Sequence, residues 1–289
     1  MKRNFILGEE WLFYKIYCGI RHSDKIIVDA LLPTIRELKK LEIIDKWFFV
    51  RYNDPDYHLR LRFHLKKQES VGSVIFQLKD IFKQYLESRV IWKVETGMYV
   101  REIERYGYSS ILLIEDIFYN DSEFVAKSLN IIEKEEELAL FTLKSIDCLL
   151  EDFQYSETQK LKLYKQGSQA FHVEFKSDNP LKKTLQRKFR RLKPKLQQMM
   201  QMDFPLEQEK SLKLLLNERS EKNLKLCLEI NDLELNNQLT VSKEEIVHNL
   251  IHMHINRIFR TKQRRYELVC YDLLYNYYKS IKYLHNINI

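Results

Sequence analysis

The stretch from Asn53 to Phe63 carries the most obvious chemistry of the chain, because it reads NDPDYHLRLRF. Its second half alternates, with His58, Arg60 and Arg62 at one parity and Leu59, Leu61 and Phe63 at the other. Since side chains of a strand point alternately to opposite faces, one face would be apolar and the other cationic. Planar guanidinium groups bind both oxygens of a carboxylate or phosphate at once. The stretch therefore predicts an anion site on a sheet.

Further arginines fall near this row. Arg51 lies on the strand expected to pair with it, and Arg101 and Arg105 share a parity on a later segment, residues 92–107, that reads as extended. Several guanidinium groups on one sheet face repel each other unless an anion or acidic neighbours join them. The alternative interpretation is an edge strand whose basic residues only keep it soluble.

A second group of candidates is HNLIHMHINR, residues 248–257. On a helix His248, His252 and Asn256 share one face, and His254 lies on another. A histidine there can exchange a proton near neutral pH, or it can be a structural residue hydrogen-bonded in the interface between the two halves of the chain. A metal site would need His248 and His252 together with an upstream glutamate, and no further cluster of ligands supports it. We expect no metal and no other cofactor.

The elements that must position these side chains follow in the order β-α-β-β-α-β. They are a strand at 11–19, a helix at 23–43, strands at 47–54 and 58–65, a helix at 70–90 and the extended segment 92–107, with a break near Gly97. This is the order of the ferredoxin-like split unit, which has both helices on one sheet face and leaves the other open. The leucines at 59 and 61 would lie under the helices, and the cationic row would face outward.

Local signals predict where several helices begin and end. Ser23 and Asp24 are candidate caps of the first helix, and Pro33 should kink or split it. Further along, the predictions are Ser122 as cap of a helix to about residue 135, a helix at 136–152, a short strand at 169–175, a capping box formed by Ser242 and Glu245, and a last helix at 263–284.

Residues 181–195 hold eight basic residues and no acid. An apolar stripe runs through the same segment, formed by Leu181, Leu185, Phe189 and Leu192. The simplest interpretation is an amphipathic surface helix. A contact with RNA or a protein partner is the alternative.

Composition bounds the class of protein. The 289 residues carry a net charge of +7, which suggests an anionic partner without separating RNA, acidic peptide and plain solubility. Few glycines and prolines indicate long helices. The expected fold is α+β, with residues 1–110 as a ferredoxin-like portion and 111–289 as a mainly helical portion, packed as one compact unit. The scattered cysteines and the lack of long apolar runs predict a cytoplasmic protein.

Four segments of the chain, taken together, carry a resemblance to a known family: GEEWLFYKIYCG, WFFVRYNDPDYHLRLRF, YVREIERYG and LIHMHINR. Their order and spacing resemble the C-terminal elimination domain of lantibiotic dehydratases, the thiopeptide-type bacteriocin biosynthesis domain family. The resemblance implies the last step in dehydrating Ser and Thr of a ribosomally made precursor peptide. A partner region places glutamate from glutamyl-tRNA on the hydroxyl, and the elimination domain expels it. Without the long glutamylating region, the chain is expected to be a stand-alone elimination half.

The resemblance also assigns residues. It implies catalytic roles for Arg60, Arg62, Arg105 and His252. Weaker substrate-binding candidates are Arg51, Tyr99, Arg101, Glu102, Asn256 and Arg257. The family often has glycine where this chain has Tyr108 and Arg260, so the local backbone is expected to differ there.

Two other functions stay open at this point. Pyridine synthases of thiopeptide biosynthesis share the resemblance and join two dehydroalanines in a formal [4+2] cycloaddition, which does not need glutamate-binding arginines. A non-catalytic module that binds peptide or RNA is the second alternative, although the chain lacks an RNP-like aromatic pattern and a G-x-x-x-x-G-K loop. The expected partners are a glutamylated precursor peptide and a glutamyl-tRNA-dependent protein. A homodimer is among the assemblies left open.

Overall fold

The computed structural model describes the backbone of residues 1–202 and 207–287 and the side chains of residues 1–202 and 210–282. It divides into two compact units, one of residues 1–131 with 229–261 and one of residues 132–228 with 262–289. The α+β class predicted from the sequence is confirmed. The division into portions at residue 110 stays a prediction.

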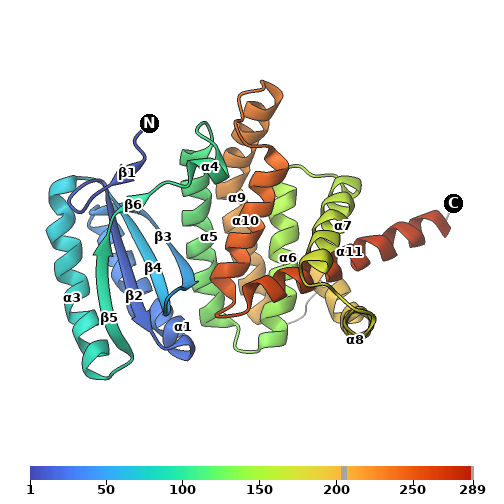
Figure 1. The fold of residues 1–289 in the computed structure, drawn as a ribbon, viewed down its shortest axis with the longest axis horizontal. Helices are drawn as coiled ribbons and strands as arrows, with labels where there is room; N and C mark the ends of the chain where they lie inside the picture. Colours follow the sequence, from blue (N-terminus) through green and yellow to red (C-terminus); the bar gives the residue numbers. More distant parts are fainter. Residues whose placement is uncertain (203–206, 288–289) are drawn as a thin grey trace. The chain divides into compact units, whose positions relative to one another are not determined.

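The first unit contains a sheet whose strands follow the order β3-β4-β2-β5, with each neighbouring pair antiparallel. The strands are β2 (Trp11–Cys18), β3 (Ile44–Asn53), β4 (Tyr57–Leu65) and β5 (Ile91–Gly97) (Figure 1). A smaller antiparallel pair joins β1 (Asn4–Phe5) to β6 (Tyr99–Val100). The predicted strands at 11–19, 47–54 and 58–65 are thus confirmed, as their β-branched and aromatic content favours.

The helices between the strands begin with short turns. They are the 3-10 turn Ile20–His22, α1 (Ser23–Lys25), the π-helical segment Ile26–Leu31, α2 (Leu32–Lys40), the 3-10 turn Gln68–Ser70 and α3 (Val71–Glu87). The π-helical segment lies immediately before Pro33, and Leu32 N–H donates to the Ile27 carbonyl five residues earlier. Because proline has no N–H to donate, the predicted break in this helix is confirmed as a change of helical register.

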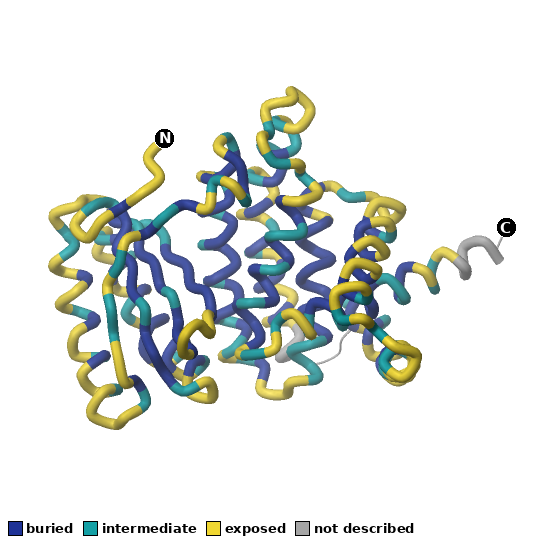
Figure 2. Tube along the Cα trace, viewed as in Figure 1, coloured by how far each residue is buried: buried dark blue, intermediate teal, exposed yellow. Residues whose placement is uncertain are grey.

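One face of the sheet is covered by helices as predicted. Leu59, Leu61 and Phe63 are fully buried. Tyr14, which pairs with Leu61 and so shares its face, meets Phe82 of α3 edge-on with ring centroids 5.4 Å apart. Figure 2 shows the same pattern, since α3 is mostly exposed with buried positions recurring along one side, while the central strands are largely dark blue. The apolar half of the alternation thus forms the core.

The opposite face is not open, so the prediction of an uncovered cationic row is wrong. Phe48 lies on this face, because it pairs with Arg62, and its ring packs 5.5 Å from Phe118 of α5 (Ile111–Ile131). His58 is fully buried and Arg62 is only 8% exposed. The row shares its face with aromatic side chains, and these require cover from water. Helices α4 (Ile103–Tyr106), α5 and α10 (Lys243–Ile258) belong to the same unit.

The extended interpretation of residues 92–107 holds as far as Val100, with the predicted break near Gly97, but it is wrong for residues 103–106, which form α4. The chain leaves β5 at Gly97, pairs briefly with β1 through β6, and then turns into α4. Arg105 N–H and Tyr106 N–H both donate to the Glu102 carbonyl, at 3.0 and 3.1 Å. Arg101 and Arg105 therefore do not share a strand face, because local helical hydrogen bonds replace the strand ladder.

The second unit is helical. Its helices are α6 (Glu135–Asp152), α7 (Glu157–Glu174), α8 (Asn179–Gln201) and α11 (Gln263–Ile287), while α9 (Glu207–Leu235) belongs partly to each unit. The predicted strand at 169–175 is wrong, because it lies at the end of α7, which a capping box of Ser156 and Gln159 begins. Gly167 explains how α7 meets α11, since a Cβ there would lie 2.3 Å from the Tyr271 ring. Leu185 and Leu192 are buried, as the amphipathic α8 predicts.

The predicted caps divide into right and wrong ones. Ser242 does cap α10, accepting from Glu245 N–H at 3.2 Å. Ser122 is no cap, because it lies buried in the middle of α5. Ser23 and Asp24 make no capping bond either and bind a distant arginine instead.

None of the described helices combines the length and the apolar character that a membrane span requires.

Candidate active site

A pocket of about 100 Å³ in the first unit collects most of the residues that the sequence analysis singled out. Its lining comes mainly from β3, β4, β6, α4, α5 and α10 and includes Arg51, Arg60, Arg62, Tyr99, Glu102, Arg105, His252 and Asn256. Arg101 and Arg257 do not line it. Segments some two hundred residues apart in the chain thus meet at one small cavity with a mixed polar and apolar lining.

Arg62 is the deepest cation of the pocket. Its guanidinium carbon lies over three aromatic rings, 4.8 Å from the Phe13 centroid and 5.1 Å from those of Phe48 and Tyr99. Its Nε and Nη1 are buried and have no hydrogen-bond partner among the described residues. An unsatisfied buried polar group costs about 1–3 kcal/mol, and more when it is charged. Burial lowers the pKa of Arg62 to about 10, so it still carries its charge near neutral pH.

Arg60, two residues earlier, is held from two sides. Its guanidinium carbon lies 3.5 Å from the centroid of the Tyr52 ring, and its Nε donates to His58 Nε2 at 3.1 Å. The side chain is half-buried and lines the pocket. Stacking and the Nε bond leave its two terminal nitrogens available to a ligand.

The third predicted catalytic arginine stands at the mouth of the pocket. Arg105 donates to Glu102 at 3.2 Å, and both side chains are more than 40% exposed. The Arg105 carbonyl accepts from Asn249 Nδ2 at 3.2 Å, which ties α4 to α10. From α10, one turn further along, His252 reaches the same pocket. An acid–base group therefore lies in the same cavity as the cations.

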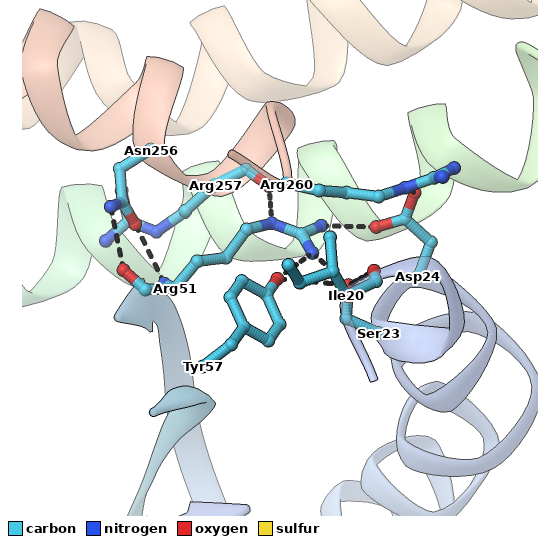
Figure 3. Close-up of polar contacts among 8 residues, drawn as sticks. All are labelled: Ile20, Ser23, Asp24, Arg51, Tyr57, Asn256, Arg257 and Arg260. Atoms are coloured by element: carbon cyan, nitrogen blue, oxygen red, sulfur yellow. Dashed lines mark hydrogen bonds and ion pairs between the residues drawn. The ribbon is translucent and has the colours of Figure 1, made fainter. Parts of the chain in front are cut away.

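Arg51 occupies a different environment from the one predicted. It pairs with Leu59, so it lies on the opposite sheet face from Arg60 and Arg62. Figure 3 shows its guanidinium enclosed by acceptors: the Arg257 carbonyl at 2.8 Å, Ser23 Oγ at 2.7 Å, the Tyr57 hydroxyl at 3.1 Å and Asp24 Oδ1 at 2.6 Å. The expected convergence of Arg51 with the cationic row is wrong, because a one-residue change of parity reverses the face.

Side chains of α5 and α10 also form hydrogen bonds with backbone groups on the outer edge of β3. The Asn256 amide accepts from Arg51 N–H at 2.8 Å and donates to the Arg51 carbonyl at 2.9 Å, as a neighbouring strand would (Figure 3). Arg257 Nε donates to the Phe49 carbonyl, and Ser122 Oγ accepts from Phe49 N–H. An edge strand with unpaired groups is a liability, and these bonds remove it. We call Ser23, Asp24, Arg51, Tyr57, Asn256 and Arg257 the edge network.

Two buried carboxylates of α5 hold the remaining arginines. Glu115 binds Arg101 through both oxygens, at 2.7 and 2.8 Å, and accepts from the Tyr99 hydroxyl at 2.7 Å. Asp121 binds Arg257 Nη1 at 3.0 Å and contacts His254 Nδ1 at 2.6 Å. Arg101 and Arg257 are thus charge-paired inside the protein, while Arg62 is not.

Tyr108 and Arg260, the two positions where the backbone was expected to differ, both make contacts of their own. Arg260 Nε donates to Asp24 Oδ2 at 2.6 Å, which adds to the edge network (Figure 3). Tyr108 N–H donates to Thr240 Oγ1 at 3.1 Å, and its hydroxyl contacts the N-terminal amine.

The sequence did not reveal which residues hold the arginines in and around the pocket in position. Tyr52 and His58 hold Arg60, and Glu115 and Asp121 hold two other arginines. The hairpin could have revealed the first pair, because its tight turn sets Tyr52 opposite His58. In the part of the chain that the structure describes, no three His, Cys, Asp or Glu side chains gather as a metal site.

Comparison with known proteins shows the family to which the chain belongs. A family model described as lantibiotic biosynthesis dehydratase, C-terminal, matches residues 11–278. The subtilin biosynthesis protein SpaB of Bacillus subtilis is 29% identical over 181 residues, which is 60% of this chain and 17% of SpaB. The chain therefore spans about a sixth of this relative.

Solved structures share the fold. The tRNA-dependent lantibiotic dehydratase MibB from Microbispora sp. 107891 matches with a TM-score of 0.72 at 19% identity, covering 95% of this chain and 28% of MibB. TbtD, the pyridine synthase from thiomuracin biosynthesis, matches with a TM-score of 0.66 at 12% identity, covering 96% of this chain and all of TbtD. With the family model matching over most of its length, the chain belongs to the C-terminal family of lantibiotic biosynthesis dehydratases.

Proposed function

We propose that the chain is a lyase that eliminates glutamate from glutamylated Ser and Thr of a precursor peptide, leaving dehydroalanine and dehydrobutyrine. The observation that carries this proposal is Arg62, a buried cation with two unpartnered nitrogens at a pocket that Arg60, Arg105 and His252 also line. Three cations without a matching set of acids favour an anionic ligand. The pocket is smaller than the roughly 300–1,000 Å³ typical of drug-sized ligands, so it suits a carboxylate-bearing side chain.

The reaction makes two demands that these residues can meet. A base removes the Cα proton of the esterified residue, and the electron pair forms the Cα–Cβ double bond as the Cβ–O bond breaks. Glutamate leaves with the γ-carboxylate carrying the negative charge. Preorganised cations aimed at developing charge stabilise it strongly in a water-poor site. We assign this role to Arg62 and Arg60, the glutamate α-carboxylate to Arg105, and proton transfer to His252.

The other candidates receive supporting roles in this proposal. Arg51, Asn256 and Arg257 belong to the edge network, and Arg101 is held by Glu115. Most of their donors are engaged with the protein itself, although Arg257 Nη2 is buried and has no hydrogen-bond partner among the described residues. Tyr99 forms part of the Arg62 aromatic surround, and Glu102 pairs with Arg105.

Two further parts of the prediction also remain proposals. The strand order β3-β4-β2-β5, with helices after β2 and β4, supports a ferredoxin-like split unit as the base of the pocket. A glutamyl-tRNA-dependent glutamylating activity would have to supply the ester. MibB, which shares the fold, is described as tRNA-dependent, and this supports such a partner step.

A mass measurement tests the function. The purified protein is incubated with a precursor peptide carrying glutamyl esters, and loss of glutamate is followed. We expect conversion to dehydrated peptide, with the His252→Ala variant leaving glutamylated peptide. Arg36→Ala, an exposed arginine of α2 away from the pocket, is the matched control and should retain activity.

Other outcomes would select other functions. Glutamylated peptide that stays unchanged, together with cyclisation of a dehydroalanine-rich peptide, would replace elimination by pyridine synthesis. Peptide that binds but never changes mass would show a non-catalytic module.

A further inference from the structure

His58 has no assigned role in the elimination, yet it is the residue that fixes Arg60. The imidazole is fully buried on the pocket side of the sheet. Its Nδ1 lies 2.8 Å from the Asp56 carbonyl, and its Nε2 lies 3.1 Å from Arg60 Nε. A carbonyl can only accept and a guanidinium can only donate. The two contacts are therefore satisfied together only by a neutral ring with the proton on Nδ1.

Aromatic rings hold the imidazole in place. The Tyr17 ring centroid lies 4.7 Å from it and the Tyr52 centroid 5.4 Å. Tyr52 also stacks on Arg60, at 3.5 Å. One face of the guanidinium and its Nε are thus fixed by neighbours from β3 and β4, and only the terminal nitrogens stay free for a ligand.

We propose that His58 is a positioning residue for Arg60: its neutral imidazole orients the Arg60 guanidinium toward the pocket, and its protonation releases that guanidinium. A proton on Nε2 removes the acceptor and sets a second cation against Arg60. The inference rests on the proposed function only for the identity of the anion, not for the position of Arg60.

The charges around the ring favour the neutral form. Burial lowers the pKa of His58 first, and the cations Arg60 on β4 and Lys15 on β2 lower it further. The bond to the Asp56 carbonyl and the charge of Glu95 on β5 act in the opposite direction. Tyr17 engages Glu95 at 3.1 Å, and Lys93 pairs with the same carboxylate, which weakens its pull on His58. The net pKa of His58 lies below its ordinary value of 6.5.

Two substitutions separate positioning from packing. His58→Gln offers a side-chain oxygen to Arg60 Nε but does not titrate. His58→Phe keeps a ring against Tyr17 and Tyr52 but offers no acceptor. Elimination is measured as kcat/KM from pH 5 to 8 in the wild type and both variants.

We expect a wild-type loss of activity on the acid side that His58→Gln moves to lower pH or removes. His58→Phe should lower kcat/KM about tenfold across the range, the size of effect that a lost hydrogen bond to a charged group produces. Identical acid limbs in wild type and His58→Gln, or full activity in His58→Phe, would overturn the inference.

Nitrogen NMR of the histidine rings decides the same question without any turnover. The His58 signal, assigned by its loss in His58→Gln, should show the Nδ1–H tautomer, and Arg60→Met should raise its pKa by removing a cation. The Nε2–H tautomer, or a pKa unchanged in Arg60→Met, would contradict the proposal. If the wild type eliminates no glutamate, the proposed function fails while this measurement still tests His58.

Discussion

The edge network and the pocket lie within one unit and both contain buried arginines, yet Arg51 of the network and Arg62 of the pocket are in opposite states. In the edge network Arg51 has an acceptor for its Nε, Nη1 and Nη2. Arg257 is charge-paired with Asp121, although its Nη2 has no hydrogen-bond partner among the described residues. In the pocket the Nε and Nη1 of Arg62 have no partner among the described residues, and aromatic rings surround it. Arg51 and Arg62 are both almost inaccessible to water, so burial alone does not distinguish them.

The difference lies in where the compensating negative charge comes from. A buried cation that has its acceptors inside the protein is needed by the fold, because removing it leaves those acceptors buried without a partner. A buried cation that lies among apolar rings and has donors without partners can still bind an anion. This difference supports a structural role for Arg51 and is consistent with the anion-binding role proposed for Arg62.

The sharpest test of this comparison is Arg62→Met. Elimination should fall by about 100- to 1,000-fold, because the variant lacks a preorganised donor for developing charge. Stability should stay level or rise by about 1 kcal/mol, since a methionine has no charge to bury unpaired. Paired kinetics and urea unfolding check this, and a destabilised Arg62→Met protein would place Arg62 with the structural arginines.

The reciprocal change is Arg51→Met. We expect a loss of about 3 kcal/mol in the free energy of unfolding, because Asp24 and the surrounding acceptors lose a buried cation. Activity per folded molecule should change far less than in Arg62→Met. Equal losses of turnover in the two variants would erase the distinction between the two sets.

Asn256→Asp probes how α10 joins β3. The aspartate still accepts from Arg51 N–H but faces the Arg51 carbonyl with an oxygen instead of a donor. We expect a destabilisation of about 2 kcal/mol, within the range for an unsatisfied buried group. Chemical denaturation measures it, with Asn236→Asp as control, since Asn236 is exposed at the end of α9.

The smallest expected effect is on how the stability of the fold depends on pH. Because the folded pKa of His58 lies below 6.5, the unfolded chain binds more protons between these two values. Stability contributed by His58 is therefore complete above pH 6.5 and decreases as the pH falls toward the folded pKa. Unfolding curves of wild type and His58→Gln between pH 5 and 7 should diverge on the acid side, and parallel curves would contradict the neutral state.

Much of the local structure followed from residue patterns. The alternation of HLRLRF predicted the strand and its buried leucines, and Ser242 predicted the start of α10. Predictions went wrong where tertiary contacts replaced local ones. Ser122 looked like a cap but pairs with the edge of β3, and Ser23 and Asp24 bind Arg51 rather than their own helix.

The sequence by itself determined which chemistry was present: a row of guanidinium groups at strand spacing and a histidine on a distant helix. It could not decide which arginines were free, because that depends on acceptors such as Glu115, Asp121 and the Arg257 carbonyl, brought close only by folding. Nor could it show that the cationic face is covered, since the covering helix α5 follows in a separate segment. Alternation along a strand is local, whereas the pairing of charges across elements is set by tertiary structure alone.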